Sequence, residues 1–142
     1  ASLANNHLIT KKDNVYKFIN KENAKKKIHC ILIDEAQFMH PKNVDELAKV
    51  ADCLDIPVIC YGLRADFRTK LFPGSRRLFE IADSIEEIKT VCECGRKATM
   101  NTRMVNGKYT FKGSQVAIDG EENVTYNSLC RKCYQEKKNN KC

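Results

Sequence analysis

The stretch Ile28-His29-Cys30-Ile31-Leu32-Ile33-Asp34-Glu35 decides the fold, because it is a compact apolar run that ends on two acids. Its aliphatic residues are mostly β-branched, which is typical of a strand buried in a parallel sheet. Pro57-Val58-Ile59-Cys60-Tyr61 has the same character and ends at Gly62. The sequence therefore predicts two buried strands that flank the residues between them.

The residues between the two strands predict an amphipathic helix. Asn43 is expected to cap this helix, with Glu46 at the third helical position. Strand, helix and strand in succession form a crossover, and such a crossover joins parallel strands, so the chain falls in the α/β class. The apolar positions at helical spacing are Val44, Leu47, Ala48, Ala51 and Leu54.

Three further elements are expected around this core. Val15, Phe18 and Ile19 stand at helical spacing and indicate a short helix. Ser75 is expected to cap another helix, and residues 85–91 are expected to return to the parallel sheet as a strand.

The character of the sequence changes after Cys92. Asn106-Gly107 is typical of a two-residue hairpin turn between strands. We therefore expect an α/β domain over residues 1–91 and a small cysteine-bounded β domain over residues 92–142. The short β-type runs of the second domain are residues 99–105, 108–111 and 115–118.

The charge of the chain, +7, is concentrated at its two ends. Seven lysines against two acids give residues 1–30 a charge of +5, and residues 130–142 carry +4, which leaves −2 for the stretch between them. A nucleic-acid-binding protein is expected to carry a basic stripe across a folded face, so this pattern indicates solvated, lysine-rich ends. No apolar run approaches the roughly 20 residues of a membrane span, and the first residues lack the layout of a secretory signal. We expect a cytoplasmic protein without nucleic-acid or membrane partners.

Asp34 and Glu35 end the first strand, and ligands of open parallel sheets bind beyond the carboxyl ends of strands. An aliphatic run that closes on two acids resembles the Walker B element of P-loop nucleotide hydrolases and kinases. The first acid would help to hold Mg²⁺ through water, and the second would take a proton or orient a nucleophile. The alternative is an acidic strand end without a chemical role.

Four of the eight cysteines lie in two close pairs, Cys92-Glu93-Cys94 and Cys130-Arg131-Lys132-Cys133. Two such pairs that flank a β-rich insertion can close a tetrahedral zinc site, which would be structural because no position stays open. Reduced thiols without metal and cross-paired disulfides are the alternatives. Cys30, Cys53 and Cys60 lie within apolar patterns and are expected to be small core residues.

Four blocks of the sequence, in order and at matching spacings, resemble the type II thymidine kinase family. Ile33-Asp34-Glu35-Ala36-Gln37-Phe38 resembles the IDE-x-QF signature of that family, and YGLRADF at residues 61–67 resembles its YGLRTDF block. Residues 94–98 and 126–133 resemble the two sides of its zinc-anchored lasso. The likeness extends over residues 28–134.

This resemblance implies an ATP-dependent thymidine kinase with a P-loop, RecA-like parallel-sheet core and a small zinc-anchored β lasso domain. Glu35 matches the general base toward the thymidine 5′-hydroxyl, Asp34 matches the acid on the Mg²⁺ side, and Arg103 matches a lasso arginine that steadies the loop. The resemblance also implies a homotetramer and feedback inhibition by thymidine triphosphate. The matched structural zinc ligands are Cys92, Cys94, Cys130 and Cys133. The residues that match the thymine walls and the base-reading stretch are Phe38, Leu63, Phe67, Phe72, Val116, Ala117, Ile118, Asp119, Gly120 and Tyr126.

Three features of the sequence depart from the family pattern. The first cysteine pair, Cys92 and Cys94, has the spacing C-x-C where C-x-x-C is common, so metal binding by both members stays open. The lasso carries Asp119-Gly120 where many bacterial relatives have two glycines. No G-x-x-x-x-G-K-[ST] phosphate-binding loop occurs in the 142 residues. We expect that loop upstream of residue 1 in the natural polypeptide, and without it this polypeptide would bind a nucleoside but not transfer phosphate. The rival interpretations are a RecA-like or helicase-type ATPase fragment whose cysteine module binds nucleic acid, and a non-enzymatic, zinc-stapled binding module.

Overall fold

The computed structural model describes residues 7–116 and 123–139. Its contacts divide the chain into two compact units. The first, here called the parallel unit, comprises residues 1–64 and 72–83, and the second, the cysteine unit, comprises residues 65–71 and 84–142. Segment 65–71 therefore belongs to the same unit as residues 84–142, although residues 72–83 of the other unit separate them in the sequence. The domain boundary near residue 91 stays a prediction.

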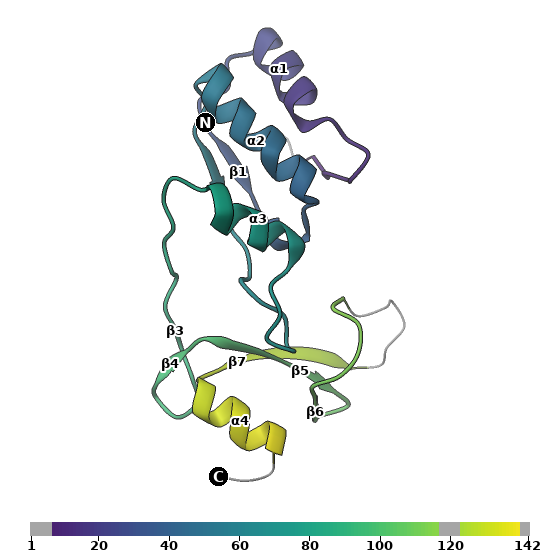
Figure 1. Cartoon of the computed structure of the whole chain (residues 1–142), viewed down its shortest axis with the longest axis vertical. Helices are drawn as coiled ribbons and strands as arrows, with labels where there is room; N and C mark the ends of the chain where they lie inside the picture. The colour runs from purple at the N-terminus through teal and green to yellow at the C-terminus, as the bar shows by residue number, and fades with distance from the viewer. Residues whose placement is uncertain (1–6, 117–122, 140–142) are drawn as a thin grey trace. The chain divides into compact units, whose positions relative to one another are not determined.

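The parallel unit is built on two short strands, β1 (Ile31–Ile33) and β2 (Val58–Cys60), with Ile31 opposite Val58. The helix α2 (Pro41–Leu54) connects them, so the predicted parallel crossover is confirmed. The predicted short helix is confirmed as α1 (Val15–Lys25), and it lies beside α2 in Figure 1. The buried apolar cluster of this unit is Val15, Ile19, Ile33, Ala36, Met39, Val44, Leu47, Val50 and Ile56.

The start of α2 differs from the prediction. Pro41 occupies the first turn and His40 is the N-cap, whose Nδ1 accepts the N–H of Lys42 at 3.2 Å. Proline suits this position because its missing N–H would have no partner inside the helix. Asn43 is instead buried and donates from its side chain to the carbonyl of Asp13 at 3.2 Å. The predicted cap is therefore wrong, and Asn43 ties α2 to the start of α1.

The same correction applies to α3 (Pro73–Ile81), which begins two residues before the predicted cap. Phe72 is the N-cap residue, and Ser75 lies inside the helix. The hydroxyl of Ser75 donates to the carbonyl of Leu63 at 2.6 Å. Ser75 therefore fastens α3 to the loop that follows β2 and does not cap the helix.

Two other expectations about residues near the parallel sheet are wrong. Residues 84–89 are irregular, and β3 (Thr90–Val91) pairs antiparallel with β4 (Lys97–Ala98) instead of joining the parallel sheet. Cys30 and Cys53 are exposed and are not core residues. Cys60 is half-buried, and burial raises the pKa of its thiol to about 11.

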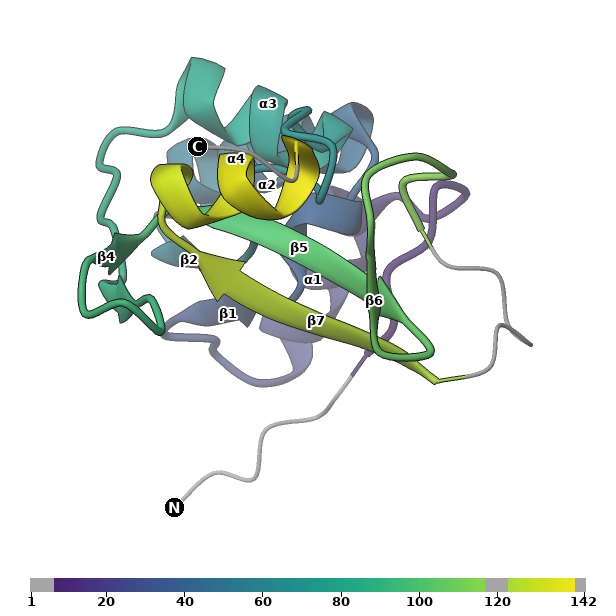
Figure 2. The same cartoon turned by 90° about the horizontal axis from the view of Figure 1, so that it is seen from below.

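The cysteine unit is an antiparallel sheet with one helix. Its strand order is β6 (Lys108–Thr110), β5 (Met100–Val105) and β7 (Val124–Leu129), and the helix α4 (Arg131–Asn139) packs against β5 and β7 (Figure 2). Asn106 and Gly107 have φ of 49° and 75°, which confirms the predicted hairpin, because a type I′ turn needs positive φ at both positions. The buried cluster of this unit is Cys92, Ala98, Leu129, Cys130, Cys133 and Tyr134.

None of the helices in the described part of the chain is long and apolar enough to cross a membrane.

Candidate functional site

Asp34 and Glu35 follow β1 at its carboxyl end, and both side chains are exposed. The N–H of Glu35 donates to Oδ1 of Asp34 at 2.8 Å. Glu35 has φ of 51°, a left-handed backbone conformation that residues other than glycine rarely adopt. Such conformations gather at functional sites, because the surrounding structure must hold them in place. The predicted pair of acids thus lies on a constrained turn.

Gln37 supplies part of that constraint, and it was missed as a site residue in the sequence. It lies in the 3₁₀ turn η1 (Ala36–Phe38) and is only 1% exposed. Its amide nitrogen donates to the carboxylate of Glu35, and its amide oxygen accepts the N–H of Leu63 at 3.1 Å. One buried side chain therefore connects the acid after β1 with the loop after β2.

Gly62 is the residue that lets this connection form. A Cβ atom at position 62 would lie 2.6 Å from the side-chain oxygen of Gln37 and 3.0 Å from its backbone nitrogen. Both distances are too short for a stable contact with a buried group, so any larger residue would displace Gln37. The signal in the sequence was the polar residue two positions after the acids together with the glycine that ends the second strand.

The parallel unit contains three of the predicted thymine-site residues. The rings of Phe38 and Phe72 meet edge to face, with centroids 5.5 Å apart and an interplanar angle of 84°. Phe38 is 57% exposed, whereas Phe72 is buried. The side chain of Leu63 is exposed, and its backbone is held by Gln37 and Ser75. These contacts bring together the Phe38 and Phe72 rings, and they fix the Leu63 backbone through Gln37.

The cysteine unit contains the other described members of the predicted site. The guanidinium of Arg103 lies 4.0 Å from the ring centre of Phe67 and 5.6 Å from that of Tyr126. Arg103 and Phe67 are each only 2% exposed, whereas Tyr126 is exposed. Arg103 on β5 is directly opposite Tyr126 on β7 in the sheet register. The arginine therefore packs between two aromatic side chains.

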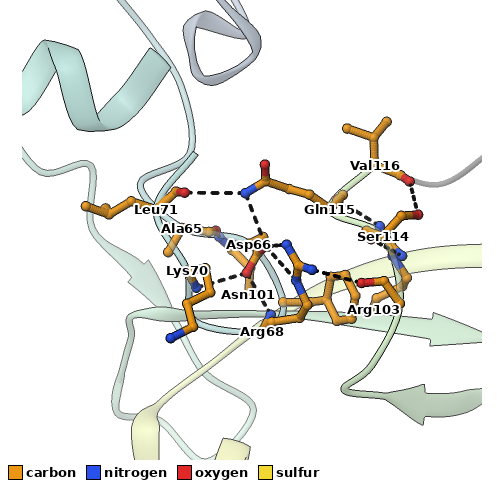
Figure 3. Close-up of polar contacts among 12 residues, drawn as sticks. Ala65, Asp66, Arg68, Lys70, Leu71, Asn101, Arg103, Ser114, Gln115 and Val116 are labelled. Atoms are coloured by element: carbon orange, nitrogen blue, oxygen red, sulfur yellow. Dashed lines mark hydrogen bonds and ion pairs between the residues drawn. The ribbon is translucent and has the colours of Figure 1, made fainter. Parts of the chain in front are cut away.

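Arg103 also holds the segment that leads into the predicted base-reading stretch. Its two terminal nitrogens donate to the carbonyls of Ser114 and Gln115, each at 3.0 Å. The hydroxyl of Ser114 donates to the carbonyl of Val116 at 2.6 Å, and the Val116 side chain is exposed (Figure 3). The remaining predicted residues of this stretch, Ala117, Ile118, Asp119 and Gly120, lie outside the described residues.

The four paired cysteines come together in space. Their sulfur atoms all lie within 4.8 Å of one another, and Cys94 Sγ is 3.6 Å from Cys130 Sγ. Thiolates at about 2.3 Å from a tetrahedral zinc ion would lie roughly 3.8 Å apart, so the arrangement fits such an ion. The described cysteines form no disulfide. Cys92, Cys94, Cys130 and Cys133 are thus a candidate zinc-binding set, and the short spacing of the first pair does not keep either member away.

Local backbone explains why these cysteines meet. In the turn between β3 and β4, the N–H of Gly95 donates to the carbonyl of Cys92 at 2.8 Å, and Gly95 has φ of 83°. Cys130 immediately precedes α4, so Cys133 returns to the same side one turn later. The N–H of Cys133 donates to Cys130 Sγ at 3.4 Å.

Backbone donors also prepare two of the thiols to lose a proton. The N–H of Cys94 lowers the pKa of Cys92 to about 7, and the N–H of Cys133 lowers the pKa of Cys130. The pKa of Cys133 is raised by its side-chain hydrogen bonds with Cys94, which has the larger effect, and with Cys130. Since the thiolate is the form that binds a metal, these lowered pKa values favour the binding form of Cys92 and Cys130.

Comparison with known proteins identifies the relatives of this chain. The family model described as thymidine kinase matches residues 2–134. The chain is 47% identical over 130 residues to a thymidine kinase of Ruegeria pomeroyi, and this alignment covers 91% of the chain and 65% of the relative. It is 50% identical over 126 residues to a thymidine kinase of Zymomonas mobilis, with 88% of the chain and 64% of the relative covered. A thymidine kinase of Mesorhizobium japonicum is 52% identical over 110 residues, or 77% of the chain and 53% of the relative. The chain spans just under two thirds of the length of the first two relatives and about half of the third.

Proposed function

The chain belongs to the thymidine kinase family, and from that premise we propose that its protein transfers the γ-phosphate of ATP to the 5′-hydroxyl of thymidine. The observation that carries this proposal is the Glu35 carboxylate, which follows a parallel strand and is tethered by the buried amide of Gln37. In sheets of this kind, substrates bind beyond the carboxyl ends of the strands. A P-loop, RecA-like core for the whole protein is part of the same proposal.

Glu35 is the proposed general base. A base must reach the proton it removes in a fixed geometry, and the left-handed backbone of Glu35 together with the Gln37 amide restricts where the carboxylate can point. Asp34 is proposed to help hold the Mg²⁺ that accompanies ATP. Its carboxylate is exposed, and hard oxygen ligands suit this ion. Mg²⁺ bound to ATP neutralises the charge that develops on the phosphates.

We assign thymine contacts to two sets of residues. In the parallel unit these are the apolar side chains of Phe38, Leu63 and Phe72, and in the cysteine unit they are Phe67, Val116 and Tyr126. Flat apolar walls with a few fixed polar groups are what a pocket for a nucleobase requires. Arg103 is assigned a supporting role, since its donors are spent on the carbonyls of Ser114 and Gln115. The backbone of Ile118, Asp119 and Gly120 is proposed to read the base edge.

Structural zinc is proposed at Cys92, Cys94, Cys130 and Cys133. With four thiolates the ion would have no open position, so its contribution is to hold β3, β4 and the start of α4 together. A homotetramer and feedback inhibition by thymidine triphosphate complete the proposal, and both rest on the family resemblance alone.

The test is a thymidine kinase assay on the full protein with Glu35→Gln. The substitution keeps the shape of the side chain but cannot accept the proton, so turnover is expected to fall by at least about a hundredfold while thymidine affinity is retained. Glu86→Gln, the same change at an exposed glutamate with no assigned role, is the matched control and should leave turnover unchanged. An active Glu35→Gln protein would overturn the assignment of the base, and a wild type that does not phosphorylate thymidine would overturn the function.

A further inference from the structure

Asp66 is a buried acid in a loop of the cysteine unit. The residue is 3% exposed, although it belongs to the irregular segment 65–71. Oδ1 accepts the N–H groups of Arg68 and Lys70, each at 2.9 Å. Oδ2 accepts from Nε and Nη2 of Arg68, at 2.9 and 2.7 Å, and from the side-chain amide of Gln115, at 3.2 Å (Figure 3). Both carboxylate oxygens are therefore fully engaged.

Two of these side chains connect the loop with a segment far along the sequence. Gln115 lies 49 residues from Asp66 and also donates to the carbonyl of Leu71 at 3.4 Å. Arg68 donates from Nη1 to the carbonyl of Gly113 at 3.0 Å, across 45 residues. We call Asp66, Arg68 and Gln115 the clasp, because together they join segment 65–71 to segment 113–116.

The clasp is not needed merely to close a turn. The turn is already closed by the N–H of Asp66, which donates to the carbonyl of Lys70 at 2.8 Å, and by the bridge between Ala65 and Leu71. Burial by itself would raise the pKa of Asp66, but the hydrogen bonds from Lys70 and Arg68 outweigh it, so the pKa is lowered and the acid stays ionised. A buried charge is costly unless its partners are well placed. The donors of Arg68 and Gln115 depend on the Asp66 carboxylate, so its removal would disturb both segments.

Each segment carries a residue that we assign to the thymine site, directly beside a clasp residue. Phe67 follows Asp66, its carbonyl accepts the hydroxyl of Tyr134 at 2.6 Å, and its ring stacks under Arg103. Val116 follows Gln115, whose own carbonyl is held by Arg103. The clasp thus fixes the backbone immediately before Phe67 and immediately before Val116.

We propose that Asp66, acting through Gln115 and Arg68, is a positioning residue that sets Phe67 and Val116 for the nucleoside. This inference rests on the proposed function. Its consequence is selective: loss of the clasp weakens thymidine binding, and it leaves ATP binding and the chemical step largely as they are. The hydrogen bonds of the clasp described above join residues of the cysteine unit, whereas the proposed base, Glu35, belongs to the parallel unit.

The experiment exchanges the acid and the amide. Asp66→Asn places an amide nitrogen against the donors of Arg68 and Gln115, and Gln115→Glu places a second carboxylate against Asp66. Each single variant is expected to raise the thymidine KM about tenfold, with kcat and the ATP KM changed by less than about twofold. The double variant restores one donor opposite one acid, so its thymidine KM is expected to lie below those of the single variants. The recovery is partial, because the Arg68 donors still face the amide at position 66 and the Leu71 carbonyl loses its donor.

Gln135→Glu, the same change on α4 of the same unit, is the matched control and should leave the thymidine KM unchanged. The inference is overturned if the single variants leave the thymidine KM unchanged, if both Michaelis constants and kcat deteriorate together, or if the double variant is no better than the singles. Gln115→Glu keeps all the bonds within segment 65–71, so it remains a test even if Asp66→Asn does not fold. A wild type without thymidine kinase activity overturns the proposed function, whereas an active wild type with unaffected variants overturns this inference alone.

Discussion

In the parallel unit the buried cluster is aliphatic except for one methionine and comes from α1, α2, β1 and the adjoining turns, whereas three of the six members of the buried cluster in the cysteine unit are cysteines. The first unit can be stabilised by removing apolar surface from water, at about 1.5–3 kcal/mol for each fully buried Val or Leu side chain. The second has only Ala98 and Leu129 as aliphatic members of its cluster. Small units with so little apolar interior usually need a metal or disulfides, so the two units should respond differently to the same perturbations.

Metal removal is the strongest way to separate the two units. If zinc binds the four cysteines, its apparent free energy of binding is on the order of 10–16 kcal/mol, and a chelator withdraws all of it. We expect backbone amides of β5 and β7 to lose their protection from hydrogen exchange, while those of α2 stay protected. Cys133→Ser should have the same effect, and Cys53→Ser, at an exposed cysteine of α2, should have none. Equal loss of protection in α2 would show that the units do not differ in this way.

The converse perturbation is a cavity in the parallel unit. Leu47 is 2% exposed on α2, and Leu47→Ala is expected to lower the free energy of unfolding by about 2–5 kcal/mol, because the removed methyl groups leave a hole that neighbours fill only partly. Leu8→Ala makes the same change at a residue that is 83% exposed, so it should have little effect. Urea unfolding of the zinc-loaded protein would measure both. A loss below about 1 kcal/mol for Leu47→Ala would contradict an apolar origin of stability in this unit.

How far the sequence predicted these units follows from the same difference. The parallel crossover was predictable because its aliphatic residues recur at strand and helix spacing. The clustering of the four cysteines was predictable because metal ligands often come in close pairs. The caps of α2 and α3 were mistaken because Pro41 and Pro73 set the first turns, which released Asn43 and Ser75 for contacts with distant segments.

The elements that escaped prediction are polar ones. No apolar pattern announced β7, whose middle residues are exposed, or α4, of which only Cys133 and Tyr134 are buried. Gln37 and Asp66 escaped for a related reason. A polar side chain becomes a buried anchor only through partners elsewhere in the chain, at Leu63 for one and Gln115 for the other, and local spacing carries no record of those partners.

The two anchors sharpen the comparison, because one is a neutral amide and the other a charged acid. Gln37→Leu removes the donor to Glu35 and the acceptor for Leu63 without changing the size of the side chain greatly. Misplacing a catalytic group by about 1 Å can cost on the order of a hundredfold, so we expect kcat to fall by about ten- to a hundredfold. The thymidine KM should rise by a smaller factor, because the Leu63 backbone also loses its acceptor. Gln135→Leu, on α4, is the control for the loss of a glutamine. An unchanged kcat would mean that Gln37 supports the fold but not the acid.

The charged anchor should make the cysteine unit sensitive to acid. Hydrogen bonds hold the pKa of Asp66 below its ordinary value of 3.8, despite a burial effect in the opposite direction. A lowered pKa in the folded state stabilises the protein above the unfolded value, and this stabilisation is lost as the pH falls through the folded pKa. The difference in unfolding free energy between wild type and Asp66→Asn should therefore be constant near neutral pH and shrink below about pH 3.8. Loss of zinc in acid affects both proteins alike and cancels in this difference. Glu80→Gln removes an exposed, ion-paired acid of the parallel unit and should give a much smaller difference at every pH, since solvent screens such pairs. A difference for Asp66→Asn that persists unchanged in strong acid would mean that the shape of the side chain, and not its charge, anchors the loop.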